Sequence, residues 1–241
     1  MKKPIIFSVF FFIITAISSF GQDGGVWIEE VVDPDTGLRK GIIEFNDELY
    51  GVYPNRNLSG IDFTGIDLSR ADLRGSNLMG TVLSGAILDG ADLSKTDLTD
   101  SDLRITSLIN TNLSNSNLSN TKLFFSNLSN ANLNNANLNK SDLNFANLNE
   151  ANLNEANLTG ANLNGANLER ANLERATLTE VNLNATIFNN INARVAALEE
   201  QLASVTLQRD LAITERDARP TLEAVRDART GSVVLNVDPD G

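Results

Sequence analysis

The sequence predicts an all-β solenoid, in which one chain winds into stacked coils around an apolar interior. A leucine recurs at every fifth position from Leu58 to Phe188, replaced by phenylalanine only at Phe63 and Phe188, and no insertion breaks this register. A small residue, mostly Ala, Ser or Thr, stands two places before nearly all of these 27 positions, and Ile61, Ile66 and Val181 are larger exceptions. No proline occurs between residues 56 and 190, which fits an uninterrupted ladder of backbone hydrogen bonds.

A period of five excludes both a helix and a straight strand. In an α-helix a step of five residues rotates the side chain by about 140°, so the leucines would scatter around the axis. In a strand an odd step places successive leucines on opposite faces. A chain that turns a corner once per unit gives every leucine the same inward environment, and its coils stack like parallel strands about 4.8 Å apart.

Units such as Ala91-Asp92-Leu93 and Ala151-Asn152-Leu153 carry Asp or Asn directly before the leucine. They resemble the A(D/N)LXX repeats of the pentapeptide-repeat family, and the resemblance covers residues 56–190. It implies a right-handed quadrilateral parallel β-helix with four units per coil, hence nearly seven coils. The usual Asp or Asn is replaced at six positions, namely Val82, Ile87, Ser107, Lys122, Thr177 and Ile187.

Residues 1–21 have the pattern of a secretory signal peptide. Lys2 and Lys3 precede a 13-residue, nearly unbroken apolar run, and small residues follow it, which predicts cleavage near Gln22. The run is shorter than the ~20 residues that span a bilayer, so we expect no stable membrane span after cleavage. An uncleaved anchor is the alternative. After cleavage the mature protein is expected outside the cytoplasm, in the periplasm, on the cell surface or in the medium.

Residues 22–55 are expected to form an N-terminal cap built on a β-hairpin. The segments 26–32 and 38–45 have strand character, and the Asp-Pro-Asp-Thr-Gly sequence at 33–37 is a turn between them. We expect the aromatic residues of this region to plug the first coil. They are Trp27, Phe45, Tyr50 and Tyr53. A carbohydrate-stacking aromatic site is the alternative reading.

Residues 191–230 are expected to form a helical tail. Val195, Leu198, Leu202 and Val205 are spaced by three and four residues, which predicts a helix that ends at Pro220. A second short helical piece is expected over 221–229, and residues 231–241 are expected to form a terminal strand and turn. The helix can cap the last coil or pair with another chain, and two good heptads favour capping over a coiled coil.

One corner of the predicted coil carries the candidate partner-binding residues. The second place after each leucine is polar or glycine in most units, and its large apolar exceptions are Ile105, Phe125 and Phe145. Four units per coil would stack these residues, which lie 20 apart, with Phe124 on the same side. In the family this position points outward, so we expect an exposed apolar ridge, which soluble proteins rarely leave bare. Three readings remain open: cover by the protein's own C-terminal helix, contact with a partner or another copy, and incidental exposure.

The composition gives no support for catalysis, a metal or a cofactor. The chain contains no histidine and no cysteine, which excludes an imidazole base and a thiolate ligand. Six aspartates stand close in sequence, at Asp62, Asp67, Asp72, Asp92, Asp97 and Asp102. Four-sided coils would scatter them over all sides and stack only Asp72 on Asp92. The net charge of −12 disfavours nucleic acid as a partner, because phosphates need Lys and Arg.

Together these features predict an exported, non-enzymatic scaffold or protein-interaction module, which binds a protein or itself through the ridge or the helical tail. One alternative is an ice- or glycan-binding surface on stacked asparagines, for which the chain offers Asn127, Asn147 and Asn167 and also Asn132, Asn152 and Asn172. Another is the DNA-mimicking, gyrase-protecting branch of the family, which export and the thinly spread acidic charge disfavour.

Overall fold

The computed structural model describes residues 25–188 and, beyond them, residues 199, 202–203, 205–211 and 213–214. The predicted signal peptide (1–21), the cleavage point near Gln22, the beginning of the helical tail, the piece at 221–229 and the terminal strand at 231–241 lie outside the described residues.

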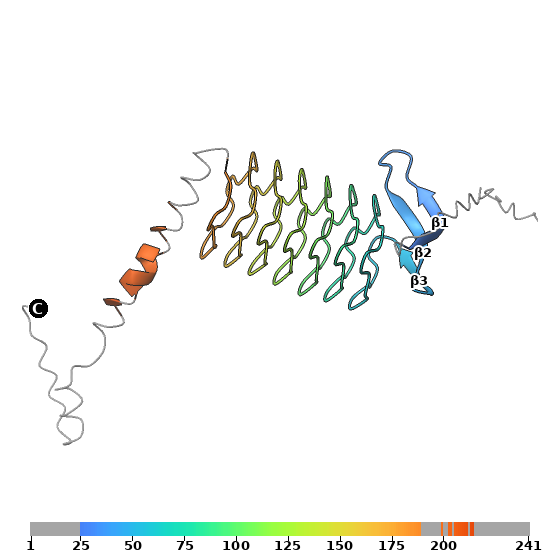
Figure 1. Cartoon of the computed structure of the whole chain (residues 1–241), viewed down its shortest axis with the longest axis horizontal. Helices are drawn as coiled ribbons and strands as arrows, with labels where there is room; N and C mark the ends of the chain where they lie inside the picture. Colours follow the sequence, from blue (N-terminus) through green and yellow to red (C-terminus); the bar gives the residue numbers. More distant parts are fainter. Residues whose placement is uncertain (1–24, 189–198, 200–201, 204, 212, 215–241) are drawn as a thin grey trace, which may run out of the picture.

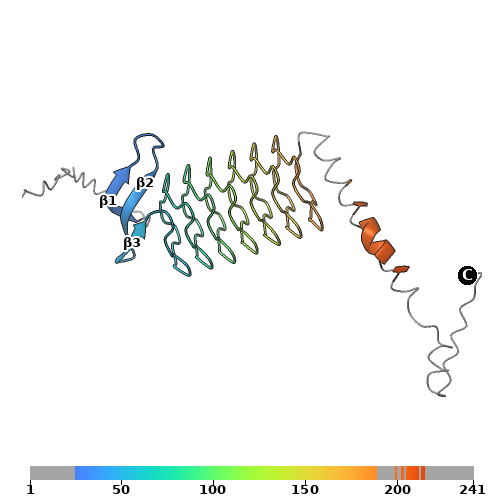
Figure 2. The same ribbon diagram turned by 180° about the vertical axis from the view of Figure 1, so that it is seen from behind.

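The repeats form a four-sided solenoid. Parallel bridges join the residue before each leucine to its equivalent 20 residues later, from Asn57 with Asn77 to Asn167 with Ile187. Twenty residues are four units of five, as the resemblance implied. Each bridge is made by two backbone hydrogen bonds; Leu58 N, for example, donates to Asn77 O at 2.8 Å. Figures 1 and 2 show the coils stacked into a straight rod.

The repeated leucines share one dry interior channel. From Leu68 to Leu168 none of them exposes more than 2% of its surface. The small residues line the channel beside them, and their buried hydroxyls bond to leucine carbonyls; Thr81 Oγ1 donates to Leu78 O at 2.6 Å. A buried hydroxyl without such a partner would be destabilising, so Ser and Thr substitute for Ala only because this acceptor is in reach.

Each corner of the coil is formed by the two residues that follow the leucine, and the second of them has a left-handed backbone. Gly60 has φ 70° and Asn130 has φ 58° at equivalent places. Glycine adopts this region without steric cost and asparagine tolerates it well. The outward direction of this second corner residue is what exposes the ridge positions.

An antiparallel sheet with the order β1-β2-β3 precedes the first coil. β1 (Val26–Val32) and β2 (Arg39–Phe45) confirm the expected hairpin. β3 (Glu48–Val52) was not expected, and it makes the sheet three-stranded. It follows a two-residue turn at Asn46 and Asp47, whose φ angles of 52° and 61° are those of a tight hairpin turn.

β2 joins this sheet to the solenoid. Arg39 N donates to Arg70 O at 2.6 Å and Asp72 N donates to Arg39 O at 2.7 Å, so the start of β2 continues the parallel ladder of one side. Phe45 and Tyr50 then contact Phe63 of the first coil, with ring centroids 6.1 and 4.8 Å apart.

The other two aromatic residues expected in the plug have arginine partners. The Arg39 guanidinium lies 4.5 Å from the Trp27 ring centroid, and the Arg56 guanidinium lies 5.8 Å from that of Tyr53. Trp27 also packs partly buried against the core, and its Nε1 is buried without a hydrogen-bond partner. The contact with Phe63 is therefore made by Phe45 and Tyr50.

The described residues between 199 and 214 are helical, as expected at Leu202 and Val205. Figure 1 shows them beyond the last coil, and Gln208 Nε2 donates to Glu180 Oε1 at 2.9 Å. Leu202 and Val205 are 67% and 61% exposed, so at these positions the helix does not pack its apolar side chains on the last coil. Within the described part of the chain, no helix is both long and apolar enough to traverse a bilayer.

Candidate interaction surface

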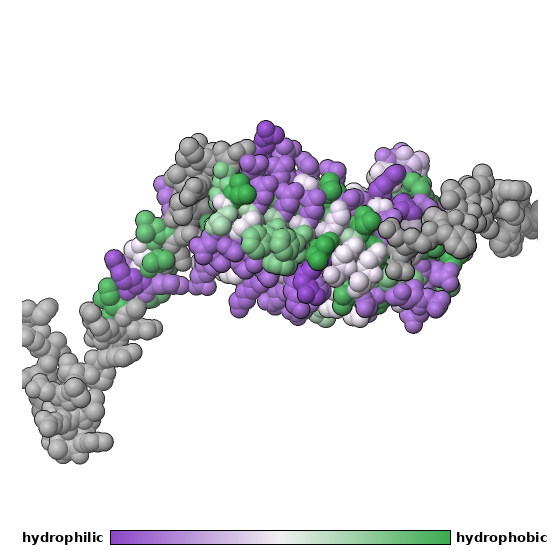
Figure 3. All heavy atoms as spheres, viewed as in Figure 1, coloured by the Kyte–Doolittle hydropathy of each residue, from purple (hydrophilic) through white to green (hydrophobic). Residues whose placement is uncertain are grey.

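The apolar ridge, defined as Ile105, Phe124, Phe125 and Phe145, lies on one corner of the solenoid. Ile105, Phe125 and Phe145 occupy the second corner position of three successive coils, with φ of 60°, 57° and 56°. They are 66%, 54% and 46% exposed, and Phe124 is half-buried beside them. Figure 3 shows an apolar area over the middle coils, enclosed by polar residues. The structure therefore brings the four sequence-predicted residues together, while their role in binding stays a prediction.

The three aromatic rings of the ridge hold one another in place. Phe125 and Phe145 stack with an interplanar angle of 14° and centroids 5.2 Å apart. The Phe124 ring meets both of them edge-on, at 4.3 Å from Phe125 and 6.1 Å from Phe145. These are favourable aromatic geometries, so the three rings stabilise one another's positions.

Gly165 provides the space into which the last ring of the ridge leans. A Cβ atom added at Gly165 would lie 2.5 Å from Cδ1 of Phe145, which is closer than real Cβ atoms approach. At Gly80, a corner glycine of another column, the added Cβ would meet nothing within 4 Å. The Phe145 ring thus lies over the next coil, a relationship that sequence reasoning missed although Gly165 stands 20 residues further on.

The second corner position carries no polar side chain along the column that contains the ridge. Every twentieth residue at this position is uncharged and apolar or glycine: Gly65, Gly85, Ile105, Phe125, Phe145, Gly165 and Ala185. The other three corners carry charges, for example Lys95, Lys140 and Arg170. Comparison of every twentieth residue would have revealed this difference from the sequence.

Ile105 adds a sign of backbone strain. A β-branched residue at φ 60° is a genuine outlier, because its side chain crowds the left-handed backbone. Strained residues of this kind gather at functional sites, where the surrounding structure over-determines them. The other columns use glycine, asparagine or charged residues for the same turn, so Ile105 is not required by the fold.

Basic residues flank the ridge on one side. The side chain of Arg104 is 51% exposed and pairs with Asp102 at 2.7 Å, and this hydrogen bond raises the pKa of Arg104. Burial raises the pKa of Asp102, but the hydrogen bonds and charge of Arg104, together with the charge of Lys122, outweigh it and lower that pKa. Lys122 itself is exposed.

The stacked asparagines that were an alternative surface are bonded internally. Asn152 Nδ2 donates to Asn132 Oδ1 at 3.2 Å, and Asn132 Oδ1 also accepts from Asn134 N at 3.2 Å. The expected alignment of Asn127, Asn147 and Asn167 is confirmed, with amide bonds of 3.1 and 3.4 Å. These amides therefore hold neighbouring coils together.

The acidic residues are also part of the scaffold. Asp72 bridges to Asp92, the one stacked pair expected among the six aspartates. Asp72 is 2% exposed, and both of its carboxylate oxygens accept from Arg74 at 2.7 Å. Within the described residues, no group of three or more His, Cys, Asp or Glu side chains is placed to hold a metal ion.

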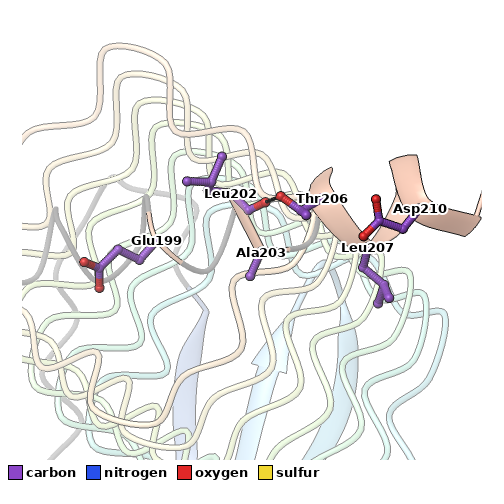
Figure 4. A pocket seen from close by; sticks show the side chains of 6 residues that line it. All are labelled: Glu199, Leu202, Ala203, Thr206, Leu207 and Asp210. Atoms are coloured by element: carbon purple, nitrogen blue, oxygen red, sulfur yellow. Dashed lines mark hydrogen bonds between the residues drawn. The ribbon is translucent and has the colours of Figure 1, made fainter.

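The C-terminal helix carries a second apolar surface, which sequence analysis did not resolve. An open groove along it, here called the helix groove, is drawn in Figure 4 and is lined by Glu199, Leu202, Ala203, Thr206, Leu207 and Asp210. The Thr206 hydroxyl donates to Leu202 O at 2.8 Å, so the middle of the groove presents no unbonded hydroxyl.

Comparisons with known proteins agree with this architecture. The chain matches the family model described as pentapeptide repeats in eight copies, over residues 55–85, 86–123, 116–154, 126–165 and 151–190. No curated protein matches the chain.

Three solved structures are similar to this chain: two are described as pentapeptide repeat proteins, and the third is a resistance protein. HetL, involved in heterocyst differentiation regulation in the cyanobacterium Nostoc sp. strain PCC 7120, is 27% identical over 58% of this chain and 90% of its own, with a TM-score of 0.26. Rfr23 from the cyanobacterium Cyanothece 51142 is 27% identical over 56% and 90%, with a TM-score of 0.34. QnrB1, a plasmid-mediated fluoroquinolone resistance protein, is 20% identical over 61% and 87%, with a TM-score of 0.29.

The family match runs through residues 55–190, which is more than half of the 241 residues. The chain therefore belongs to the pentapeptide-repeat family, and its four-sided solenoid is the right-handed quadrilateral β-helix of that family.

Proposed function

We propose that this protein is an exported, non-enzymatic protein-interaction module, in which the solenoid is a rigid scaffold and the apolar ridge is the binding surface. One observation carries the proposal: two stacked aromatic rings, Phe125 and Phe145, stand exposed in the one column of second corner positions that has no polar side chain. Apolar patches of this kind on soluble proteins mark interaction sites.

The rigidity of the scaffold supports binding. Phe125 N donates to Asn144 O at 3.1 Å and Phe145 N donates to Asn164 O at 2.9 Å, so each ridge residue is held by the ladder of the next coil. A surface fixed in advance loses little conformational entropy when a partner docks. Aromatic side chains are also the residues that most often dominate binding energy at interfaces.

The absence of histidine and cysteine from the sequence supports a non-enzymatic role. Among the described residues, the most deeply buried carboxylate is that of Asp72, which is paired with Arg74. The apolar run with its basic start in residues 1–21 supports export, with the mature chain beginning near Gln22. N-terminal sequencing of the protein recovered outside the cytoplasm tests this part; an intact Met1 would contradict it.

Within this proposal the flanking elements protect the ends of a rod of nearly seven coils. β2 and the aromatic contacts of Phe45 and Tyr50 would cap the first coil. Capping matters because an open ladder of N–H and C=O groups is a template for aggregation.

Site-specific photo-crosslinking in the producing cell tests the binding role. A benzophenone amino acid replaces Phe125 in one variant and Asn135 in a matched control, since Asn135 is an exposed corner residue two units away, on the diagonally opposite corner. We expect discrete cross-linked products from position 125 and none from position 135. Absence of products at 125, or identical products at both positions, would contradict the proposal.

A further inference from the structure

The chain carries two exposed apolar surfaces that do not meet within one molecule. The ridge lies on the middle coils, whereas the helix groove lies beyond the last coil, where Gln208 bonds to Glu180. We infer that the helix groove of a second copy docks on the ridge, in a reciprocal exchange that makes a two-fold symmetric dimer. This inference rests on the proposed function and names the partner as another copy of the chain.

The two surfaces match in length. Ile105 and Phe145 are two coils apart, which is roughly 10 Å at the spacing of stacked strands. Leu202 and Leu207, the large apolar residues of the groove, are five residues apart, or about 7.5 Å along a helix. Glu199 and Asp210 lie at the two ends of the groove, about 16 Å apart by the same rise. One helix segment therefore spans the ridge with its acidic residues beyond the aromatic rings.

The charges at the two surfaces are compatible with docking. The groove has an acidic residue at each end, Glu199 and Asp210, and no basic residue in its lining. The flank of the ridge presents the exposed side chains of Arg104 and Lys122. Arg104 is already paired with Asp102, and Lys122 stacks between Asp102 and Asp142, so the acidic ends of the groove would share these cations with the solenoid and the apolar match carries the inference.

The helix itself requires a partner. Leu202 and Leu207 of the groove are 67% and 63% exposed, and Val205 and Leu211, outside the groove lining, are 61% and 57% exposed. Short helices are marginal alone in water, and a helix with apolar residues on several sides is normally buried. Docking on the ridge would cover the groove side and stabilise the helix.

The small size of each surface indicates that both molecules exchange their helices, so that two junctions form. A buried aromatic side chain contributes about 150–250 Å², whereas stable interfaces bury about 1,200–2,000 Å² in total. One ridge with one helix falls short of that range, and two symmetry-related junctions approach it. Because a two-fold exchange uses both surfaces of both molecules, it closes without leaving a free ridge or a free helix groove to extend a fibre.

Two variants of the full-length chain test the exchange by sedimentation equilibrium. The ridge variant carries Phe125→Asn and Phe145→Asn, since asparagine occupies equivalent corners at φ 55–58°, as at Asn135 and Asn130. The helix variant carries Leu202→Gln and Leu207→Gln, because glutamine keeps helix propensity. A control with Asn115→Ser and Asn135→Ser changes the diagonally opposite corner. Thermal unfolding verifies that each variant is folded.

We expect the wild-type and control proteins to dimerise, and each variant alone to dimerise at least tenfold more weakly. An equimolar mixture of the two variants should form a heterodimer that is weaker than the wild-type dimer but tighter than either variant alone, because the intact helix of one meets the intact ridge of the other at one of the two junctions. Pairing of helix with helix predicts instead that the ridge variant dimerises like wild type and that the mixture recovers nothing. Either result would overturn the inference, as would a wild-type protein that stays monomeric at all concentrations.

A second measurement covers the case in which the ridge variant does not fold. A labelled peptide of residues 191–219 should bind wild-type protein, and the same peptide with Leu202→Gln and Leu207→Gln should bind at least tenfold more weakly. Equal binding of the two peptides would overturn the inference. If the purified chain is monomeric while cross-links from position 125 identify a different protein, the exchange fails and the interaction function stands.

Discussion

Asn112 donates a hydrogen bond from Nδ2 to Oδ1 of Asp92, one coil earlier, at 3.1 Å. The same contact repeats toward the C-terminus, where Asn132 donates to Asn112 and Asn152 donates to Asn132, both at 3.2 Å. On two other sides of the solenoid, ladders end in the same way, at Asp97 and Asp142. These three ladders therefore run in one direction and end on a carboxylate, which can accept but cannot donate.

This polarity predicts that exchange of Asn and Asp lowers stability in the middle of a ladder but not at its acceptor end. Asn132→Asp removes a donor in mid-ladder and sets a carboxylate against Asn112 Oδ1, so we expect it to lower the free energy of unfolding by about 1–2 kcal/mol. Asp92→Asn keeps the acceptor and relieves the repulsion with the stacked Asp72, so we expect no loss of stability. Urea unfolding at neutral pH measures both.

Asn130→Asp is the matched control for this prediction, because it adds the same charge on an exposed corner. A loss for Asn130→Asp as large as that for Asn132→Asp would show that net charge, and not the ladder, determines the effect.

The contact between Phe145 and Gly165 predicts a coupled pair of substitutions. Gly165→Ala meets both a left-handed backbone, at φ 68°, and the Phe145 ring, whereas Gly80→Ala at φ 65° meets only the backbone cost. That backbone cost is about 1–2 kcal/mol. We expect Gly165→Ala to be more destabilising than Gly80→Ala by about 1 kcal/mol, the scale of losing one aromatic contact.

The excess should vanish when Phe145→Asn is already present, because the ring no longer occupies the space. Thermal unfolding of the four proteins of this cycle gives the coupling energy. Strict additivity would mean that the ring does not lie over Gly165.

Phe63 differs from the leucines at equivalent positions because it contacts Phe45 and Tyr50 of the N-terminal sheet. Phe63→Leu restores the usual repeat residue, yet we expect it to lower the free energy of unfolding by about 1–2 kcal/mol, since it leaves space in a buried contact. In a double-mutant cycle with Phe45→Leu the two losses should be less than additive. If Phe63→Leu is neutral or stabilising, the sheet does not depend on this contact.

The lowered pKa of Asp102 predicts a stabilisation that depends on pH. Burial raises this pKa, and the stronger opposing effect of Arg104 and Lys122 lowers it below its usual value of 3.8. A carboxyl group with a lowered folded-state pKa stabilises the fold above its unfolded pKa, and this contribution is lost as pH falls through the folded value. Asp102→Asn should therefore be destabilising at pH 7 and less so near pH 2. Chemical denaturation at both pH values provides the comparison, and an equal loss at each would contradict the assignment.

The solenoid was predictable because its determinants repeat. Because the leucines recur every five residues and all point inward, the chain must turn once per unit, whatever secondary structure the individual residues favour. The family resemblance supplied the number of units per coil, which is four. The ridge followed from the same register, since residues 20 apart, such as Phe125 and Phe145, must stack. In a regular solenoid, the spacing of two residues in the sequence therefore predicts whether they contact each other in neighbouring coils.

The elements that sequence reasoning missed lack that repetition. β3 was not expected, because its Gly51 weakens the strand pattern and its turn depends on left-handed φ at Asn46 and Asp47. The space over Gly165 depends on the direction in which the Phe145 ring leans, which no residue pattern specifies. The helix groove could not be predicted because the sequence does not specify which sides of the C-terminal helix the rest of the chain leaves exposed.

The central claim is that the ridge is free of its own chain and becomes buried when the protein binds. Because the sequence contains no cysteine, Ile105→Cys and Asn135→Cys each introduce a single thiol, whose rate of maleimide labelling reports accessibility. In dilute protein we predict similar rates at both positions, and at high concentration a selective slowing at position 105. Slow labelling at position 105 even in dilute protein would show that its own tail covers the ridge, and equal rates at every concentration would show that nothing docks there.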